Sequence, residues 1–118
     1  MIQFTTARCT VRRMAESDLP AMHAVYGDPE TVRFVGDKAT LSPEQCRKWL
    51  EVTLANYAAR GYGMFTIVEL ASGDAIGFCG IVHPGGQPTP EIKYAFRRDL
   101  WGRGLAREVV PALLAHGL

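Results

Sequence analysis

Apolar residues at every second position mark the parts of this chain that we expect to form β-strands. The alternation is clearest over residues 91–97, where one face is apolar and the other is mixed: Ile92, Tyr94 and Phe96 against Glu91, Lys93 and Ala95. Strands are also expected over 9–14, 63–70 and 75–83. The turn-forming residues 72–74 between the last two strands predict a hairpin.

Apolar residues three and four positions apart predict helices. The first helix is expected to begin at an N-cap, Ser17, and to run through Tyr26. The second begins at the N-cap Ser42, where Pro43 suits the first helical position and Gln45 completes a capping box. The two apolar stripes consist of Leu19, Met22, His23 and Tyr26, and of Cys46, Trp49, Leu50, Thr53, Leu54 and Tyr57.

Breaks in these patterns place the remaining elements. The second helix is expected to end at Gly61. Residues 83–90 are rich in proline and glycine and predict a loop. A last helix is expected over 103–116, bent or loosened at Pro111, because proline has no N–H to donate to the carbonyl of Arg107.

A glycine-rich segment, Trp101-Gly102-Arg103-Gly104-Leu105-Ala106, lies between the last predicted strand and the last predicted helix. Glycines let several backbone N–H groups converge on one anion, and a following helix adds its unpaired N–H groups and the positive end of its dipole. The segment therefore predicts a site for a phosphate or pyrophosphate. Its spacing fits neither a P-loop, which needs Lys before Ser or Thr, nor a dinucleotide-binding turn, whose third glycine position falls on Arg107. A plain strand-to-helix turn is the alternative.

The stretch from Glu91 to Val110 resembles the acetyl-CoA-binding segment of the GNAT superfamily of N-acetyltransferases, and most of all the branch that includes RimJ and RimL. In that branch an acidic residue and an apolar strand with Tyr precede Trp-Gly-x-Gly-x-Ala and a helix. Residues 10–14 and 28–34 are also similar to the family, so the resemblance covers essentially the whole chain. It implies a GNAT-like, mostly antiparallel sheet flanked by helices. It also implies acetyl transfer from acetyl-CoA to a primary amine of a protein N-terminus, a polyamine or a small antibiotic-like molecule.

The same resemblance implies roles for individual residues. Glu91 would act as the general base toward the amine; the alternative is that it pairs with Lys93 or an arginine at the surface. Strand residues would hold the pantetheine arm and the thioester oxygen through their backbone: Tyr94, Ala95, Phe96 and Arg97. The glycine segment would bind the phosphates: Gly102, Arg103, Gly104, Leu105, Ala106 and Arg107. Trp101 is expected to pack beneath this segment rather than to touch the cofactor.

Other polar and aromatic residues have two interpretations each. Tyr57 and Tyr62 are candidates for an acceptor cleft or for the core. Four arginines near the glycine segment attract phosphates or form a solvated face that Asp99 and Glu108 balance: Arg97, Arg98, Arg103 and Arg107. The histidines are isolated in the sequence, with His23 on an apolar stripe: His23, His83 and His116.

The chain ends at residue 118, shortly after the helix that follows the glycine segment. The family that it resembles continues with another strand, a helix and two closing strands, which commonly supply the residue that protonates the thiolate. We therefore expect the C-terminal part of the domain to be lacking and name no general acid. Strand 91–97 would then be an edge, which favours a homodimer. A non-catalytic CoA-binding or interaction module is the alternative function.

Composition narrows the function classes. The 118 residues are enough for one small domain, and antiparallel strands joined by helices indicate the α+β class. With a formal net charge of +1, the chain has no strong positive field to attract nucleic acid, so nucleic acid is not expected as its main partner. Three widely spaced cysteines indicate neither a disulfide framework nor a zinc site and suit the cytoplasm. No apolar run is long enough to span a membrane, and no metal ligand set is expected.

Overall fold

Within residues 2–34, 40–83 and 86–117, which the computed structural model describes, the chain forms one sheet of five strands. Their order in the sheet follows the sequence: β1 (Ile2–Thr5), β2 (Cys9–Arg13), β3 (Met64–Glu69), β4 (Ala75–Val82) and β5 (Glu91–Phe96). Every neighbouring pair is antiparallel. The expected strands and the α+β class are confirmed, while two residues of the expected loop, Pro84 and Gly85, lie outside the described residues.

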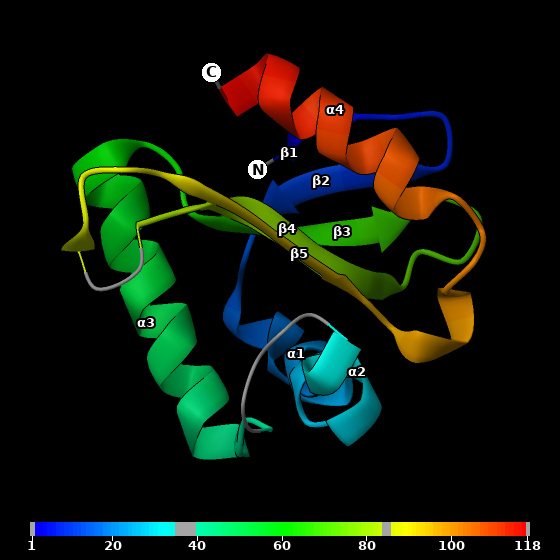
Figure 1. The fold of residues 1–118 in the computed structure, drawn as a ribbon, viewed down its shortest axis with the longest axis horizontal. Helices are drawn as coiled ribbons and strands as arrows, with labels where there is room; N and C mark the ends of the chain where they lie inside the picture. Colours follow the sequence, from blue (N-terminus) through cyan, green and yellow to red (C-terminus); the bar gives the residue numbers. More distant parts are fainter. Residues whose placement is uncertain (1, 35–39, 84–85, 118) are drawn as a thin grey trace.

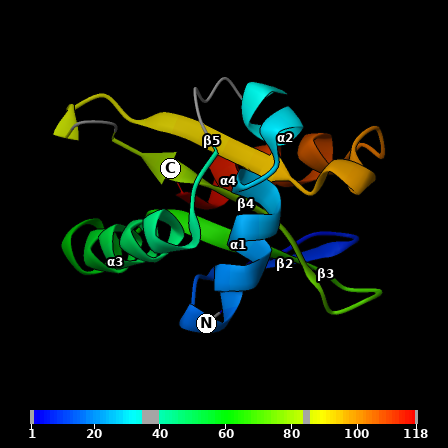
Figure 2. The same cartoon turned by 90° about the horizontal axis from the view of Figure 1, so that it is seen from below.

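Helices cover both faces of this sheet. They are α1 (Leu19–Tyr26), α2 (Pro29–Phe34), α3 (Pro43–Arg60) and α4 (Leu105–Gly117). In Figure 1, α4 lies on one face and the other three helices lie on the opposite face. Figure 2 shows α1 and α3 side by side across the sheet, with α4 behind it. The sheet is therefore the middle of three layers.

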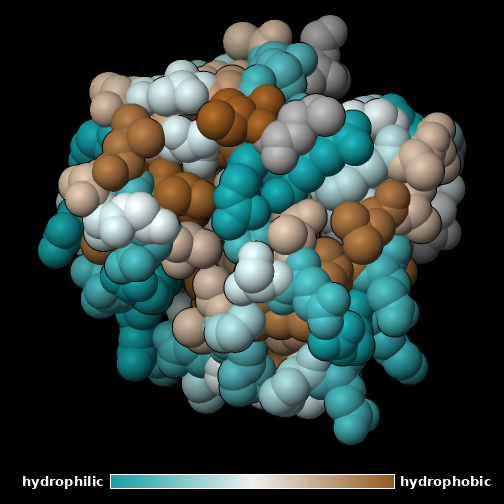
Figure 3. All heavy atoms as spheres, turned by 180° about the vertical axis from the view of Figure 1, so that it is seen from behind, coloured by the Kyte–Doolittle hydropathy of each residue, from teal (hydrophilic) through white to brown (hydrophobic). Residues whose placement is uncertain are grey.

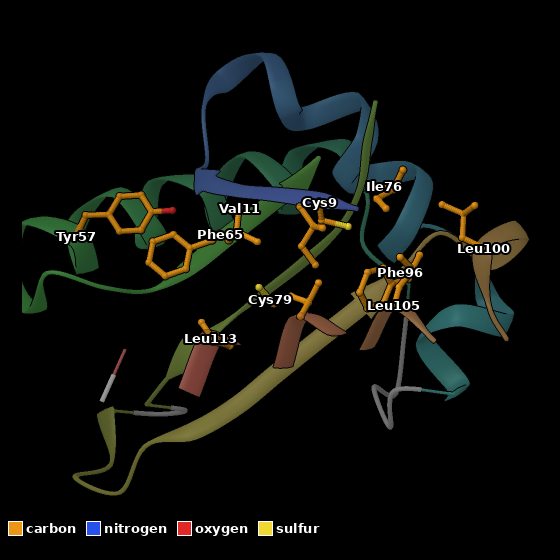
Figure 4. Close-up of a cluster of buried hydrophobic side chains, with 12 residues drawn as sticks. Cys9, Val11, Tyr57, Phe65, Ile76, Cys79, Phe96, Leu100, Leu105 and Leu113 are labelled. Carbon is orange, nitrogen blue, oxygen red and sulfur yellow. The ribbon is translucent and has the colours of Figure 1, made fainter. Parts of the chain in front are cut away.

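Each face of the sheet has its own buried cluster. The cluster under α4, part of which is shown in Figure 4, includes Cys9, Val11, Phe65, Ile67, Cys79, Phe96, Leu105, Val109 and Leu113. The cluster under α1 and α3 includes Met22, Val25, Tyr26, Cys46, Leu50, Phe78 and Ala95. Side chains alternate along a strand, so Ala95 and Phe96, which are neighbours in β5, enter different clusters. The predicted alternation in this segment is thus confirmed.

The ends of α3 follow the sequence prediction. The Ser42 hydroxyl accepts a hydrogen bond from the Gln45 N–H at 3.2 Å, and the Gln45 side chain accepts one from the Ser42 N–H at 2.8 Å. Gly61 follows the helix with a φ of 78°, the left-handed region that closes helices. The apolar stripe is correct except at Leu54, which is 47% exposed because it lies at the margin of the buried stripe.

The first helix begins differently from the prediction. Residues Glu16–Asp18 form a short 3-10 turn, and α1 starts only at Leu19. Ser17 as N-cap is therefore wrong. Asp18 holds the cap position, but its carboxylate accepts hydrogen bonds from other parts of the fold instead. His23 is exposed, so its place on an apolar stripe is also wrong.

The surface of the described residues has an open strand edge and scattered apolar groups (Figure 3). β5 is an edge of the sheet, as expected, and its Ile92 and Tyr94 are 37% and 42% exposed. On the side seen in Figure 3, apolar residues form separate groups among polar ones. None of the described helices combines the length and apolar character needed to cross a bilayer.

Candidate functional site

A cavity of about 250 Å³ lies between the end of β5 and the beginning of α4. Its walls come from β5, the glycine segment and the first turn of α4: Tyr94, Ala95, Phe96, Leu100, Trp101, Gly102, Gly104, Leu105, Ala106 and Arg107. The structure thus brings together most of the residues expected to bind a cofactor. Arg97 and Arg103 are not among the lining residues.

The glycine segment takes a conformation that requires its glycines. Gly102 and Gly104 have φ values of 81° and 75°, in the left-handed region that other residues rarely adopt. The Gly104 carbonyl accepts the hydrogen bond from the Glu108 N–H at 3.2 Å, which starts α4. The N–H groups of the first turn of α4 have no acceptor within the helix. They lie beside the cavity and make its glycine end suited to an anion.

Trp101 lies beneath this segment. Its indole N–H donates to the carbonyl oxygen of Phe96 at 3.0 Å, and its ring packs against the cluster under α4. This agrees with the expected packing role. The side chain also forms part of the cavity wall, so it connects the last residue of β5 to the glycine segment.

The free edge of β5 contributes backbone groups to the cavity. In the register of β4 and β5, Phe96 lies opposite Gly77. The N–H of Arg97, which follows Phe96, donates to the carbonyl of Ile76, which precedes Gly77, at 2.8 Å. In an antiparallel ladder this makes Phe96 and Gly77 a pair without mutual hydrogen bonds. The backbone N–H and C=O of Phe96, and by the same alternation those of Tyr94, therefore point to the open edge.

The four arginines near the glycine segment fall into two groups. Arg97 pairs with Asp99 at 2.7 Å, and Arg98 pairs with Asp28 at 3.2 Å. The hydrogen bond from Arg97 lowers the pKa of Asp99. Because both the backbone N–H and the guanidinium of Arg97 are engaged elsewhere, this residue does not fit its expected cofactor role.

Arg103 and Arg107 form the second group. Both are exposed, and neither side chain takes part in an ion pair within the described parts of the chain. The idea that Asp99 and Glu108 balance all four arginines is therefore only partly right. Asp99 pairs with Arg97, whereas Glu108 pairs with Arg8 at 2.7 Å.

Glu91 is exposed at the start of β5, on the face toward α1 and α3. Its carboxylate accepts a hydrogen bond from the Gln87 side-chain amide at 3.1 Å. Within the described chain no ion pair joins Glu91 to Lys93 or to an arginine, so the surface pairing considered above is wrong. The Lys93 ammonium instead lies over the Trp49 ring, 5.0 Å from its centroid.

A hydrogen-bonded chain leads from Glu91 to an aromatic residue. The Gln87 backbone carbonyl lies 3.0 Å from His83 Nδ1, and Tyr62 Oη lies 2.7 Å from His83 Nε2. A carbonyl only accepts, so His83 Nδ1 donates to it, and Nε2 shares a hydrogen bond with the Tyr62 hydroxyl. His83 is therefore not isolated. Sequence reasoning missed Gln87, because nothing in a proline-rich and glycine-rich loop marks a glutamine as functional.

Tyr57 belongs to the core rather than to a cleft. Its hydroxyl donates to the Met64 carbonyl and accepts from the Met14 N–H at 3.0 Å. Burial raises its pKa to about 12. The three cysteines are free and buried, and burial raises the pKa of Cys79 to about 12, which fits a core residue and not a nucleophile.

Comparison with known proteins decides the family. Residues 8–118 match the family described as "Acetyltransferase (GNAT) domain". The chain belongs to this family. GNAT acetyltransferases transfer an acyl group from acetyl-CoA, so the cavity beside the glycine segment lies in an acetyltransferase fold.

Several proteins resemble this GNAT chain over most of its length. An uncharacterized N-acetyltransferase, p20 of Bacillus licheniformis, is 29% identical over 95% of the chain and 64% of its own length. The crystal structure of an acetyltransferase from Agrobacterium tumefaciens str. C58 has a TM-score of 0.80 at 29% identity, covering 95% of this chain and 64% of that one. The chain thus spans less than two thirds of the length of these relatives.

A second solved structure shows the fold with a ligand. RimL, a ribosomal L7/L12 alpha-N-protein acetyltransferase in complex with coenzyme A, has a TM-score of 0.75 at 20% identity, covering 98% of this chain and 67% of that one. At this identity the likeness shows the fold alone. The expected GNAT-like sheet flanked by helices is therefore confirmed.

Proposed function

We propose that this GNAT chain binds acetyl-CoA between β5 and α4 and transfers the acetyl group to a primary amine. The observation that supports the proposal most is the cavity between these elements, which the glycine segment helps to line. Glycines in the left-handed region and the first turn of a 13-residue helix meet there beside Arg107. This combination suits a pyrophosphate.

Each wall of the cavity has a part in this proposal. The first-turn N–H groups of α4 would bind the phosphates, and Arg103 and Arg107 would add positive charge without first breaking an ion pair of their own. The outward N–H groups of Tyr94 and Phe96 would hold the pantetheine arm and the thioester oxygen, as another strand would. The proposed cofactor residues are thus Tyr94, Ala95, Phe96, Gly102, Arg103, Gly104, Leu105, Ala106 and Arg107.

Glu91 is the proposed base. Acetyl-CoA supplies an acetyl group activated as a thioester. The amine nitrogen forms a bond to the carbonyl carbon, the C–S bond breaks, and the thiolate takes a proton from water. Glu91 accepts the proton that the nitrogen releases, and Gln87 holds the carboxylate at 3.1 Å. Because Glu91 faces the side of α1 and α3, the amine would approach from that side.

Similarity and charge support two proposed classes of acceptor. A protein N-terminus is one class, since a fold neighbour is named as an alpha-N-protein acetyltransferase. Small amines are the other class, and a net charge of +1 gives no reason to expect nucleic acid. Free buried cysteines suit a reducing compartment, so we place the reaction in the cytoplasm.

Replacement of Glu91 tests the proposed chemistry. Glu91→Gln should abolish acetyl transfer to a panel of peptides and polyamines, and should leave the affinity for acetyl-CoA unchanged. Glu69→Gln is the matched control, because Glu69 also lies at a strand end and accepts one side-chain hydrogen bond, from Ser72 at 2.8 Å. Equal loss of transfer in both variants, or full transfer by Glu91→Gln, would contradict the assignment of the base.

A CoA-binding module without catalysis is the second candidate function. This function needs only the cavity and the glycine segment, which are present whether or not Glu91 acts as a base. Acetyl-CoA binding by the parent chain without transfer to any amine of the panel would support this alternative.

We also propose a homodimer in which a second copy covers the exposed Ile92 at the beginning of β5, whereas the outward N–H groups of Tyr94 and Phe96 are left for the cofactor. Light scattering should then show a dimer that Ile92→Lys disrupts. A monomer at all concentrations would contradict this.

A further inference from the structure

We infer that Arg8 is a positioning residue that, together with Glu108, holds the glycine segment in the shape that receives the phosphates of acetyl-CoA. The inference rests on the proposed function, since it concerns the same site. Arg8 lies in the turn between β1 and β2, nearly the whole length of the chain before the segment that it contacts. It is not part of the cavity wall, so its effect on the cofactor is indirect.

Three hydrogen bonds of Arg8 define this contact. Its Nη1 donates to the carbonyl oxygen of Arg103 at 2.8 Å, inside the glycine segment. Its Nε donates to Glu108 Oε1 at 2.7 Å, and its backbone N–H donates to Glu108 Oε2 at 2.8 Å. The Thr6 hydroxyl also donates to Oε2. The turn between β1 and β2 therefore holds both the glycine segment and the first turn of α4.

The bond to Arg103 orients the peptide that follows it. A peptide unit is planar and trans, so its C=O and N–H point in opposite directions. Since the Arg103 carbonyl points to Arg8, the Gly104 N–H points away from Arg8. Gly104 lines the cavity and Arg8 does not, so this arrangement favours an N–H directed to the cavity side. Gly104 has a φ of 75° and access to many backbone conformations, so an external constraint is useful at this residue.

The bonds to Glu108 remove an electrostatic obstacle. Glu108 lies in the first turn of α4, beside the proposed phosphate site, and a bare carboxylate there would repel a phosphate. Arg8 pairs with this carboxylate and compensates its charge. Loss of Arg8 would therefore release the glycine segment and also expose an unpaired negative charge near the bound phosphates.

The test compares Arg8→Ala and Arg8→Lys with a control on the other face of the sheet. Arg47→Ala is matched, because Arg47 is also half-exposed and pairs with a glutamate, Glu16, at 3.0 Å. Calorimetry with coenzyme A should show about tenfold weaker binding for Arg8→Ala, the effect of one lost charge-assisted hydrogen bond. Arg8→Lys keeps the charge and should lie between Arg8→Ala and the parent. Arg47→Ala should bind like the parent.

Amide hydrogen exchange of the free protein gives a second readout. At a temperature well below the unfolding midpoint, Arg8→Ala should raise the amide exchange rate at Gly104, Leu105 and Ala106. The exchange rates of the amides in β3 should stay unchanged. A variant that unfolds at lower temperature but binds coenzyme A as tightly as Arg47→Ala would show a merely structural role and overturn the inference. If the parent chain binds no coenzyme A, the proposed function fails; unchanged exchange at these amides would independently overturn the positioning role.

Discussion

Asp18 is the residue whose replacement should destabilise the fold most clearly. Its side chain is only 3% exposed and joins three elements. Its two carboxylate oxygens accept from the two terminal nitrogens of Arg12 at 2.8 Å each. One oxygen also accepts from the Ala15 N–H and from the Thr66 hydroxyl, both at 2.9 Å. Asp18→Ala would leave these donors without their acceptor.

The magnitude follows from burial. Removing one partner of a buried ion pair costs roughly 3–5 kcal/mol, because the remaining charge and donors lose their partner. Arg12 is 28% exposed and can gain some water, so we expect the lower end, about 3 kcal/mol. For a domain of this size that corresponds to a midpoint lower by roughly 10 °C. Urea unfolding followed by circular dichroism measures the change directly.

Glu16→Ala is the matched control for Asp18→Ala. Glu16 lies in the same 3-10 turn and also pairs with an arginine, Arg47, but it is 73% exposed. Such surface pairs contribute less than about 1 kcal/mol. If Asp18→Ala costs no more than Glu16→Ala, the ion pair with Arg12 does not stabilise the fold in the way described.

The pH dependence provides a second check on Asp18. Burial raises its pKa, but hydrogen bonds from Arg12, Ala15 and Thr66 outweigh this effect, and the pKa lies below the usual 3.8. A carboxyl with a lowered folded-state pKa stabilises the fold above its unfolded-state pKa and loses this contribution as pH falls through the folded value. The stability difference between the parent and Asp18→Asn should therefore be constant near neutral pH and shrink below about pH 3.8.

Three further variants test single contacts by urea unfolding. Ser42→Ala should cost about 1 kcal/mol by removing the N-cap of α3, and no measurable loss would contradict the capping. Gly80→Ala should cost about 2–3 kcal/mol, because a Cβ at this position would lie 2.2 Å from the carbonyl oxygen of Gly63. Gly63→Ala is the comparison and should cost less, because its Cβ would have its nearest contact at 3.4 Å. Trp101→Phe should cost about 1 kcal/mol by removing the hydrogen bond to Phe96, and a larger loss would mean that packing dominates.

Local patterns made some elements predictable from the sequence. The capping box at Ser42 and the glycine at position 61 act within a few residues, so the bounds of α3 follow from the sequence alone. The same is true of β5, the glycine segment and α4, which are consecutive. All residues that line the cavity lie between positions 94 and 107, so their order in the sequence predicted that they lie near one another.

Contacts between distant segments were not predictable in this way. β1 has only four residues, and its place depends on pairing with β2, for instance Phe4 opposite Val11. Asp18 does not cap α1 with its side chain because Arg12 and Thr66, on two strands, compete for its carboxylate. No spacing rule in the sequence announces such partners.

The candidate site also combines features that are local in the sequence with contacts between distant segments. Its backbone cradle could be predicted because glycine spacing and a helix start define it locally. The contact of Arg8 with Glu108 joins residues at opposite ends of the chain, and the bond from Gln87 to Glu91 depends on the path of a loop. Both contacts arise from tertiary structure, so only the folded chain reveals them.

Titration of acetyl-CoA into the 118-residue chain by calorimetry tests the central claim most directly. Three samples are compared: the parent, Gly104→Val in the glycine segment, and Gly73→Val in the turn between β3 and β4. The two glycines share a φ of 75°, so both variants bear similar backbone strain. We predict saturable binding to the parent and to Gly73→Val, and none to a folded Gly104→Val. Equal binding by the two variants, or no binding to a folded parent, would contradict a cofactor site at the glycine segment.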